Sequence, residues 1–170
     1  MSSDRTRQVA TALIFLVTLV INGVANALPI NGQTTGEISD RFRVFVIPAG
    51  YVFAIWALIY LGLAAFTVYQ AIRGSDPVVR RLGWLPALTG VLNTGWLLLF
   101  QYELFVLTVP VMIALLVTLI AIHRRLWEAR AALTTVSRWT IRYPFSIYLG
   151  WITVATIANI AQTLSSIGVG

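Results

Sequence analysis

The residues of this chain best suited to specific chemistry are aromatic rings and side-chain amides that recur at helical spacing. In the last apolar stretch, Tyr148, Trp151, Ala155, Asn159 and Gln162 stand at offsets of 0, 3, 7, 11 and 14. These offsets place the five side chains along one face of a single helix. Ring faces and amides together can hold a flat, apolar molecule and orient it through a few hydrogen bonds.

Two other apolar stretches carry the same kind of stripe. Trp56 and Tyr60 are one helical turn apart, while Asn93, Trp96 and Phe100 share a helical face at offsets of 0, 3 and 7. The stripes predict either a ligand cavity lined by aromatic rings or ordinary aromatic packing between helices. The spacing alone leaves both interpretations open.

Nucleophilic, acid–base and metal chemistry find little support in the sequence. The chain contains no cysteine and one histidine, His123, which stands next to Arg124 and Arg125. One imidazole forms neither a catalytic triad nor a metal site, so we predict no catalytic residue and no metal ligand. We expect His123 to face water or lipid headgroups, and Glu103 to be a hydrated turn residue. The apolar stretches lack ionisable side chains in their middles, which argues against an ion-coupled pump.

The elements that must position these rings are membrane-spanning helices. Hydrophobic residues make up 58% of the 170 residues and charged residues 11%, a balance far from that of soluble proteins. Five stretches without Asp, Glu, Lys or Arg are long enough to cross the hydrocarbon core of a bilayer, at about residues 8–28, 48–72, 82–102, 104–122 and 143–168. The sequence predicts one all-α domain over 1–170, a bundle of five transmembrane helices. Residues 8–28 also imitate a signal peptide, and we expect them to be retained as the first helix.

Arginine is distributed unevenly along the chain. There is no lysine, and ten of the twelve arginines fall in the N-terminal segment, residues 73–81 and residues 123–142. The positive-inside rule then places the N-terminus in the cytoplasm and the C-terminus outside, in what we expect to be a bacterial inner membrane. The basic charge therefore orients the chain in the bilayer, and we predict no nucleic-acid partner. In the external loop 29–47, the charged residues Glu37, Asp40, Arg41 and Arg43 could form ion pairs or a lid that attracts cations, and we favour ion pairs that order the loop.

Three segments resemble, in order and spacing, the motifs of a known family. The run from Tyr148 to Asn159 resembles the closing Tyr-x-x-Trp, Ala-Thr and Asn pattern of the translocator protein family, also called tryptophan-rich sensory proteins or peripheral benzodiazepine receptors. The residues similar to its second-helix and third-helix motifs are Pro48, Trp56 and Tyr60, and Leu92-Asn93-Thr94-Gly95-Trp96 with Phe100. The five-span layout and the external first loop also agree with this family.

The resemblance implies a five-helix membrane protein, often a homodimer, with a pocket under the first loop that accepts a tetrapyrrole such as protoporphyrin IX, a sterol or a drug. It implies a role in sensing, transport or scavenging, with no required cofactor and with a porphyrin or lipid as the bound molecule. The candidate ligand-binding residues are Trp56, Tyr60, Asn93, Trp96, Tyr148, Trp151, Ala155 and Asn159. Trp56 and Trp151 match the tryptophans linked to porphyrin binding, and any enzymatic activity would be slow, light-dependent porphyrin breakdown.

Two features depart from the family pattern. The first loop lacks a Trp-x-Pro-Pro-x-Trp segment, and Gly50, followed by Tyr51, stands where a lid aromatic residue is usual. The end of the last span also lacks the Tyr and Arg of a cholesterol-recognition motif, which leaves sterol binding with little support. The alternative function is an accessory subunit of a larger photosynthetic or respiratory membrane complex, packed against pigments, lipids or other subunits.

Overall fold

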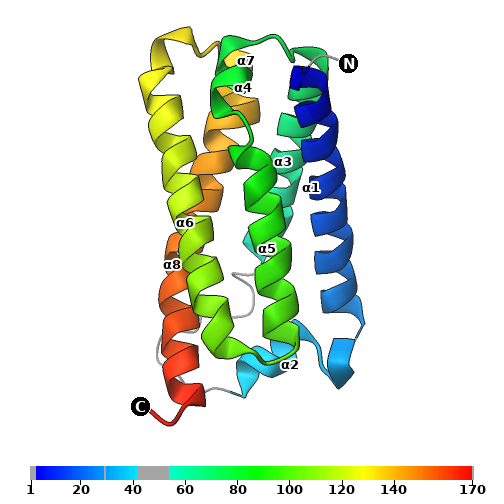
Figure 1. Ribbon diagram of the computed structural model, residues 1–170, viewed down its shortest axis with the longest axis vertical. Helices are drawn as coiled ribbons and strands as arrows, with labels where there is room; N and C mark the ends of the chain where they lie inside the picture. The colour runs from blue at the N-terminus through cyan, green and yellow to red at the C-terminus, as the bar shows by residue number, and fades with distance from the viewer. Residues whose placement is uncertain (1–2, 29, 42–53, 170) are drawn as a thin grey trace.

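A computed structural model of the chain describes residues 3–28, 30–41 and 54–169, and within these ranges the protein is helical and contains no strand (Figure 1). Pro48, Gly50, Tyr51, Arg43 and the side chain of Asp40 lie outside the described part of the chain. The predictions made on these residues therefore have no structural counterpart here.

Long helices account for most of the described chain. They are α1 (Ser3–Ala27), α3 (Ile55–Ile72), α5 (Leu85–Gln101), α6 (Phe105–Glu128) and α8 (Tyr143–Ser166). Within the described ranges, four segments are long and apolar enough to cross a membrane by length and composition, namely Asp4–Ala25, Ile55–Ile72, Phe105–Glu128 and Thr135–Ser166. Helix α5 has 17 residues and is not among them. The structure therefore bears out an all-helical protein with four candidate spans, and the count of five stays a prediction.

The long helices form a closed ring around a common core. Helix α1 packs on α3 and α5, α5 on α6, α6 on α8, and α8 on α3. Each helix turns one apolar stripe inward, as α6 does with Leu115, Leu119, Ile122 and Leu126, which are at most 1% exposed. Their spacing of three or four residues keeps them on one side of the helix. Helices far apart in sequence, such as α3 and α8, are thereby brought together.

The connection before α5 is itself partly helical. Helix α4 (Pro77–Leu82) begins where the Asp76 side chain accepts a hydrogen bond from the Val78 N–H at 2.7 Å, and it has proline in its first turn. It ends at Gly83, whose φ of 61° lies in the left-handed region that favours glycine. Helix α5 consequently begins at Leu85, whereas the sequence pattern placed the start of this span at residue 82.

The connection between α6 and α8, which the sequence pattern placed at residues 123–142, is largely helical. Helix α6 continues to Glu128, well past the predicted end of the span at residue 122. It is followed by the 3-10 turn η3 (Arg130–Ala132), the short helix α7 (Thr135–Ser137) and a π-helical turn, η4 (Arg138–Arg142). Arginines here lie over the Trp127 ring, with the guanidinium carbons of Arg130 and Arg142 at 5.1 and 5.9 Å from its centroid.

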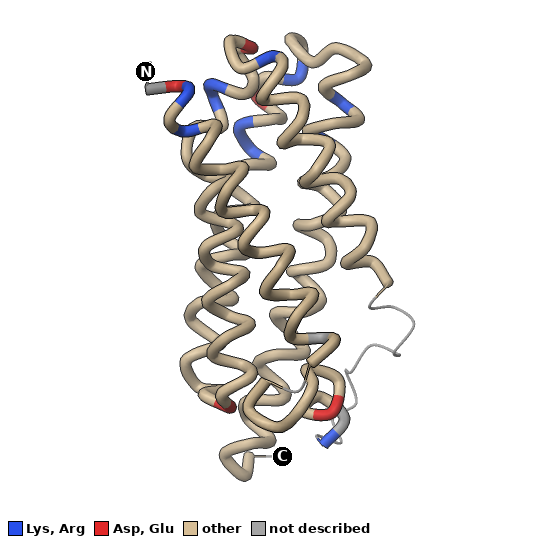
Figure 2. Tube along the Cα trace, turned by 90° about the vertical axis from the view of Figure 1, so that its right-hand side faces the viewer, with Lys and Arg blue, Asp and Glu red and all other residues tan. Residues whose placement is uncertain are grey.

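Charge is segregated along the axis of the bundle. Figure 2 shows most of the described arginines gathered at the end where the N-terminus lies, with the C-terminus at the opposite end. The middle of the bundle between the two ends carries none of these charges in that view. This arrangement suits a protein whose two ends face water and whose waist faces hydrocarbon.

Candidate ligand-binding site

Four of the predicted site residues meet in one layer of aromatic rings between α3 and α8. The Trp56 ring stacks on Tyr60, with centroids 5.4 Å apart and an angle of 20° between the ring planes. It also meets the edges or faces of Tyr148 at 6.0 Å and Trp151 at 6.1 Å, at angles of 65° and 82°. These are favourable aromatic geometries, and they make Trp56 the centre of the layer. We call these four residues the aromatic layer.

The two sides of the aromatic layer differ in burial. The rings from α8 are almost completely enclosed, with Tyr148 2% and Trp151 6% exposed. The rings from α3, Trp56 and Tyr60, are only partly buried. The layer therefore has a closed base on α8 and an accessible side on α3. Ala155, one turn beyond Trp151, is also partly buried and packs against the same core.

A second run of rings lies between α5 and α6. Trp96 stacks on Phe100 at 5.2 Å with an angle of 28°, and Phe100 meets Phe105 edge-on at 5.6 Å. Trp96 packs against the main core as well as against this smaller cluster, so it links the two sets of rings. Its indole N–H is buried and donates to no atom of the described residues. A buried donor without an acceptor is costly, which is the condition expected where a ligand atom accepts the bond.

Phe105 also lines a hollow of about 530 Å³ at the end of the bundle opposite the N-terminus. Arg41, Glu103, Val106, Ser166 and Ile167 line the rest of it. Sequence reasoning did not include Phe105 or Arg41 among the site residues. The signal available for Phe105 was its position directly after the α5–α6 turn, five residues beyond the Phe100 that the motif contains.

The side-chain amides that were predicted to orient a ligand form hydrogen bonds between helices. The Asn93 side-chain oxygen accepts a hydrogen bond from Asn22 Nδ2 at 3.0 Å, and Tyr148 approaches the same amide. Asn159 Nδ2 donates to the Thr108 hydroxyl at 2.9 Å. Both asparagines are buried, and in an apolar surround such bonds set how two helices align. Their ligand contacts stay a prediction, whereas their interhelical contacts are part of the structure.

The loop after α1 is fastened to the end of α5. It contains the turn η1 (Ile30–Gly32) and the short helix α2 (Thr35–Asp40). Asn31 Nδ2 donates to the Gln101 carbonyl and Gln101 Nε2 donates to the Gln33 carbonyl, both at 3.3 Å. Ile38 of α2 is 1% exposed and packs with Phe100 and Phe105. The loop thus covers the second run of rings.

Arg41 of this loop forms an ion pair with a neighbouring turn. Its guanidinium lies 2.7 Å from Glu103, in the α5–α6 turn. Glu37 completes the N-terminal cap of α2, accepting from the Thr34 N–H at 2.6 Å. Hydrogen bonds from the Thr34 backbone and hydroxyl hold the pKa of Glu37 below its usual value of 4.5. Glu103, predicted to be only hydrated, therefore anchors the loop, and its φ of 58° marks a tight turn.

The single histidine and the acidic residues form no metal site in the described chain. His123 is partly buried and its Nδ1 makes no hydrogen bond within the ranges that the structure covers. That it faces water or lipid headgroups stays a prediction. No group of three His, Cys, Asp or Glu residues lies close enough to hold a metal ion among the described residues. The arrangement supports binding through ring faces and N–H donors.

Comparison with known proteins gives one match. The family model described as "TSPO-like protein" matches residues 8–170. No curated protein and no solved structure matches the chain significantly.

Proposed function

The chain belongs to the TSPO-like protein family, and we propose that it binds a tetrapyrrole, or a similar flat apolar molecule, against the aromatic layer for sensing, transport or scavenging. The family match covers the segments that carry all eight candidate residues. Integral membrane location follows from the family and from the apolar helices together. The identity of the ligand is the part that we propose.

The observation that carries the proposal is the meeting of Trp56, Tyr60, Tyr148 and Trp151 in one layer. These residues come from two helices, α3 and α8, that are far apart in the sequence, and their rings are oriented around Trp56. Two of the rings, Trp56 and Tyr60, are only partly buried, and a planar ligand could stack on the surface that they leave accessible. Apolar sites of this kind bind through ring area and use few polar groups for orientation.

Two residues outside the aromatic layer offer polar contacts that a porphyrin could use. The unpaired indole N–H of Trp96 offers a hydrogen bond to a ligand acceptor. The Arg41 guanidinium, in the wall of the hollow that Phe105 lines, offers a partner for a ligand carboxylate in exchange for Glu103. Ring faces suit the apolar body of such a molecule, and an N–H donor and a cation suit its polar atoms and its acidic edge.

We further propose that α5 is the fifth span and that the N-terminus is cytoplasmic. The 17 residues of α5 extend about 26 Å as a helix, close to the thickness of a hydrocarbon core. Trp84 and Tyr102, just outside its two ends, are 55% and 57% exposed, as expected of aromatic residues at the two membrane interfaces. The gathering of arginines at the N-terminal end supports the cytoplasmic assignment, in a bacterial inner membrane.

The test is a titration of the full chain in nanodiscs with protoporphyrin IX, followed by tryptophan fluorescence. Trp56→Phe and Trp151→Phe keep a ring at each position but remove part of the stacking area. We expect saturable quenching of the wild type and dissociation constants raised about fivefold in both variants. Trp139→Phe is the control, because Trp139 is 69% exposed and its ring meets only Tyr143 among the ring contacts of the described structure.

Each outcome separates the proposal from its alternative. Saturation that Trp56→Phe and Trp151→Phe weaken, and that Trp139→Phe leaves within about twofold, supports the aromatic layer as the site. Linear quenching that no substitution changes excludes specific tetrapyrrole binding. It would favour the accessory-subunit function, in which the outer helix faces contact another subunit, pigment or lipid.

A further inference from the structure

A second hollow, unrelated to the aromatic layer, lies on the outside of the bundle. Its volume is about 600 Å³, and it is walled by Ile14 of α1 and by residues of α5 that include Leu88 and Val91. Trp84 and Arg125 also line it, near the arginine-rich end. Trp84, Leu88 and Val91 are 55%, 41% and 52% exposed. The hollow is therefore an open, apolar groove with one cation at its edge.

Arg125 is held in place by the neighbouring helix. Its Nη1 donates to the carbonyls of Arg81 and Leu82, at 2.9 and 3.1 Å. These carbonyls belong to the last turn of α4, which a cation stabilises. The remaining guanidinium nitrogens make no hydrogen bond or ion pair within the described part of the chain. Arg81 differs, since its Nη2 pairs with Glu128 at 2.7 Å.

We propose that this hollow binds one anionic phospholipid, with an acyl chain in the groove between α1 and α5 and the phosphate on Arg125. An apolar groove on the outside of a membrane helix bundle is filled by lipid chains unless protein covers it. A guanidinium fixed at the polar end of such a groove supplies the charge and the N–H donors that a phosphate requires. Basic pockets between transmembrane helices bind anionic headgroups in this way.

Charge favours lipid over a second copy of the chain as the occupant. If two copies closed over this hollow with two-fold symmetry in one membrane, their Arg125 side chains would lie at the same depth in one interface. Like charges at the edge of the hydrocarbon repel, and no carboxylate among the described residues lines the hollow to balance them. An anionic lipid instead neutralises Arg125 and fills the apolar groove.

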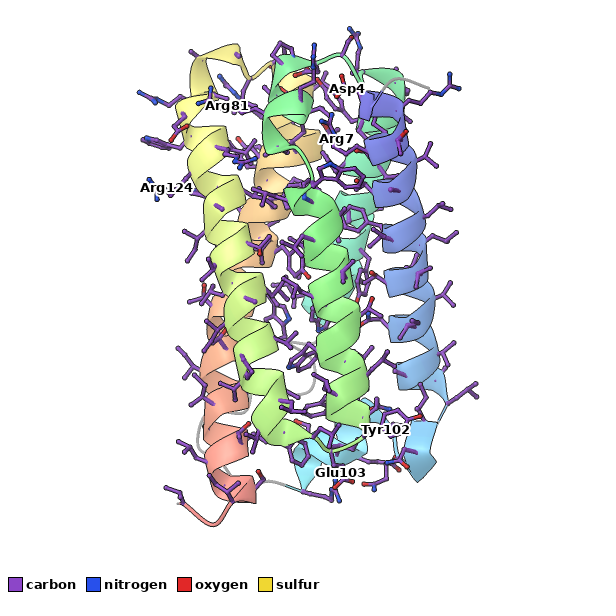
Figure 3. All side chains as sticks on the ribbon, viewed as in Figure 1. Asp4, Arg7, Arg81, Tyr102, Glu103 and Arg124 are labelled. Carbon is purple, nitrogen blue, oxygen red and sulfur yellow. The ribbon has the colours of Figure 1, made fainter. Side chains whose placement is uncertain are left out.

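The experiment is native mass spectrometry of the delipidated full chain, titrated with phosphatidylglycerol or with phosphatidylcholine of the same acyl chains. We expect one phosphatidylglycerol to bind about fivefold more tightly than phosphatidylcholine, and Arg125→Gln to remove this preference. Arg124→Gln is the matched control, because it removes the same charge one residue away. Figure 3 shows Arg124 pointing away from the bundle. Leu88→Trp fills the groove and leaves Arg125 in place, and we expect it to displace the lipid as well.

The results distinguish a specific lipid site from diffuse charge attraction, from a free anion and from a second copy of the chain. Loss of the preference in Arg125→Gln and Leu88→Trp, but not in Arg124→Gln, supports the site. Equal losses in Arg124→Gln and Arg125→Gln would mean diffuse attraction to the charged end and would overturn it. Displacement by inorganic phosphate, or a lipid-free dimer that Leu88→Trp dissociates, would also overturn it in favour of a free anion or a second copy. If Arg125→Gln loses helical circular dichroism, Leu88→Trp decides, and lipid binding unchanged in that variant overturns the proposal.

Discussion

The interface between α1 and α5 and the interface between α3 and α8 hold the bundle together in different ways. At the first, Thr18 donates to the Gly90 carbonyl at 3.1 Å and Asn22 donates to Asn93 at 3.0 Å. At the second, Phe66 meets Phe145 edge-on at 5.2 Å, and Trp56 packs against Tyr148 and Trp151. Polar hydrogen bonds join α1 to α5, whereas contacts between aromatic rings join α3 to α8.

The difference separates the interface that sets helix alignment from the interface that we propose binds a ligand. Hydrogen bonds are directional, and in an apolar surround the groups that form them have no water to bond instead, so they define how α1 and α5 are rotated and shifted. Ring contacts are less directional and can be exchanged for contacts with another flat molecule. Under the proposed function, we therefore expect a ligand to enter between rings at the α3–α8 side without breaking the alignment set by α1 and α5.

The largest expected effect comes from forcing the α1–α5 interface apart. A Cβ on Gly90 would lie 2.6 Å from Ile14 Cγ2 and 3.1 Å from Thr18 Oγ1. We expect Gly90→Val to lower the free energy of unfolding by about 3 kcal/mol, measured by SDS titration in mixed micelles. Gly95→Val is the control on the same helix, since a Cβ there meets nothing within 4 Å. Equal losses in the two variants would show that α1 and α5 are not held at close range.

A smaller effect is expected from removing one bond of that interface. Asn22→Leu leaves the buried Asn93 oxygen without its Asn22 donor and should cost about 2 kcal/mol in the same assay. Combining it with Asn93→Leu should cost less than the sum of the single losses, with a coupling of about 1 kcal/mol. Strictly additive losses would mean that the two amides contribute independently and that the bond does not set the alignment.

The smallest effect is expected at the aromatic interface. Phe66 is 1% exposed and meets Phe15 as well as Phe145, yet Phe66→Leu keeps an apolar side chain of similar volume. We expect a loss of about 1 kcal/mol in unfolding free energy, because rings nearby can shift to fill the space. A loss as large as that of Gly90→Val would remove the contrast between an alignment interface and an adaptable one.

The sequence allowed much of the fold to be predicted, because lipid demands long apolar helices and those are visible in composition. The first and last residues of each helix were harder to predict from the sequence. The start of α5 depends on the positive φ of Gly83, and the end of α6 depends on helix continuing past His123 into the arginine-rich connection. Both boundaries depend on the local backbone conformation, which a count of apolar residues does not predict.

The candidate site was predictable to the extent that helical spacing puts residues on one face. Trp56 with Tyr60, and Tyr148 with Trp151, were identifiable as stripes, and the structure joins the two stripes in one layer. Asn159 belongs to the same predicted stripe, but its partner, Thr108, lies on a different helix and its role follows from that contact. The same limit applies to the pairing of Arg41 with Glu103 across two loops.

By itself, the sequence determined an all-helical chain with apolar membrane-crossing segments, one arginine-rich end and a family membership carried by residues 8–170. Each of these depends on residue type, on spacing along one helix or on motif order, all of which can be read directly from the sequence. Only the tertiary structure decided which stripes face one another, which amides bond between helices and where Arg125 is held against α4. Those contacts depend on how separate helices are rotated and packed, and that rotation is set jointly by all the interfaces of the ring.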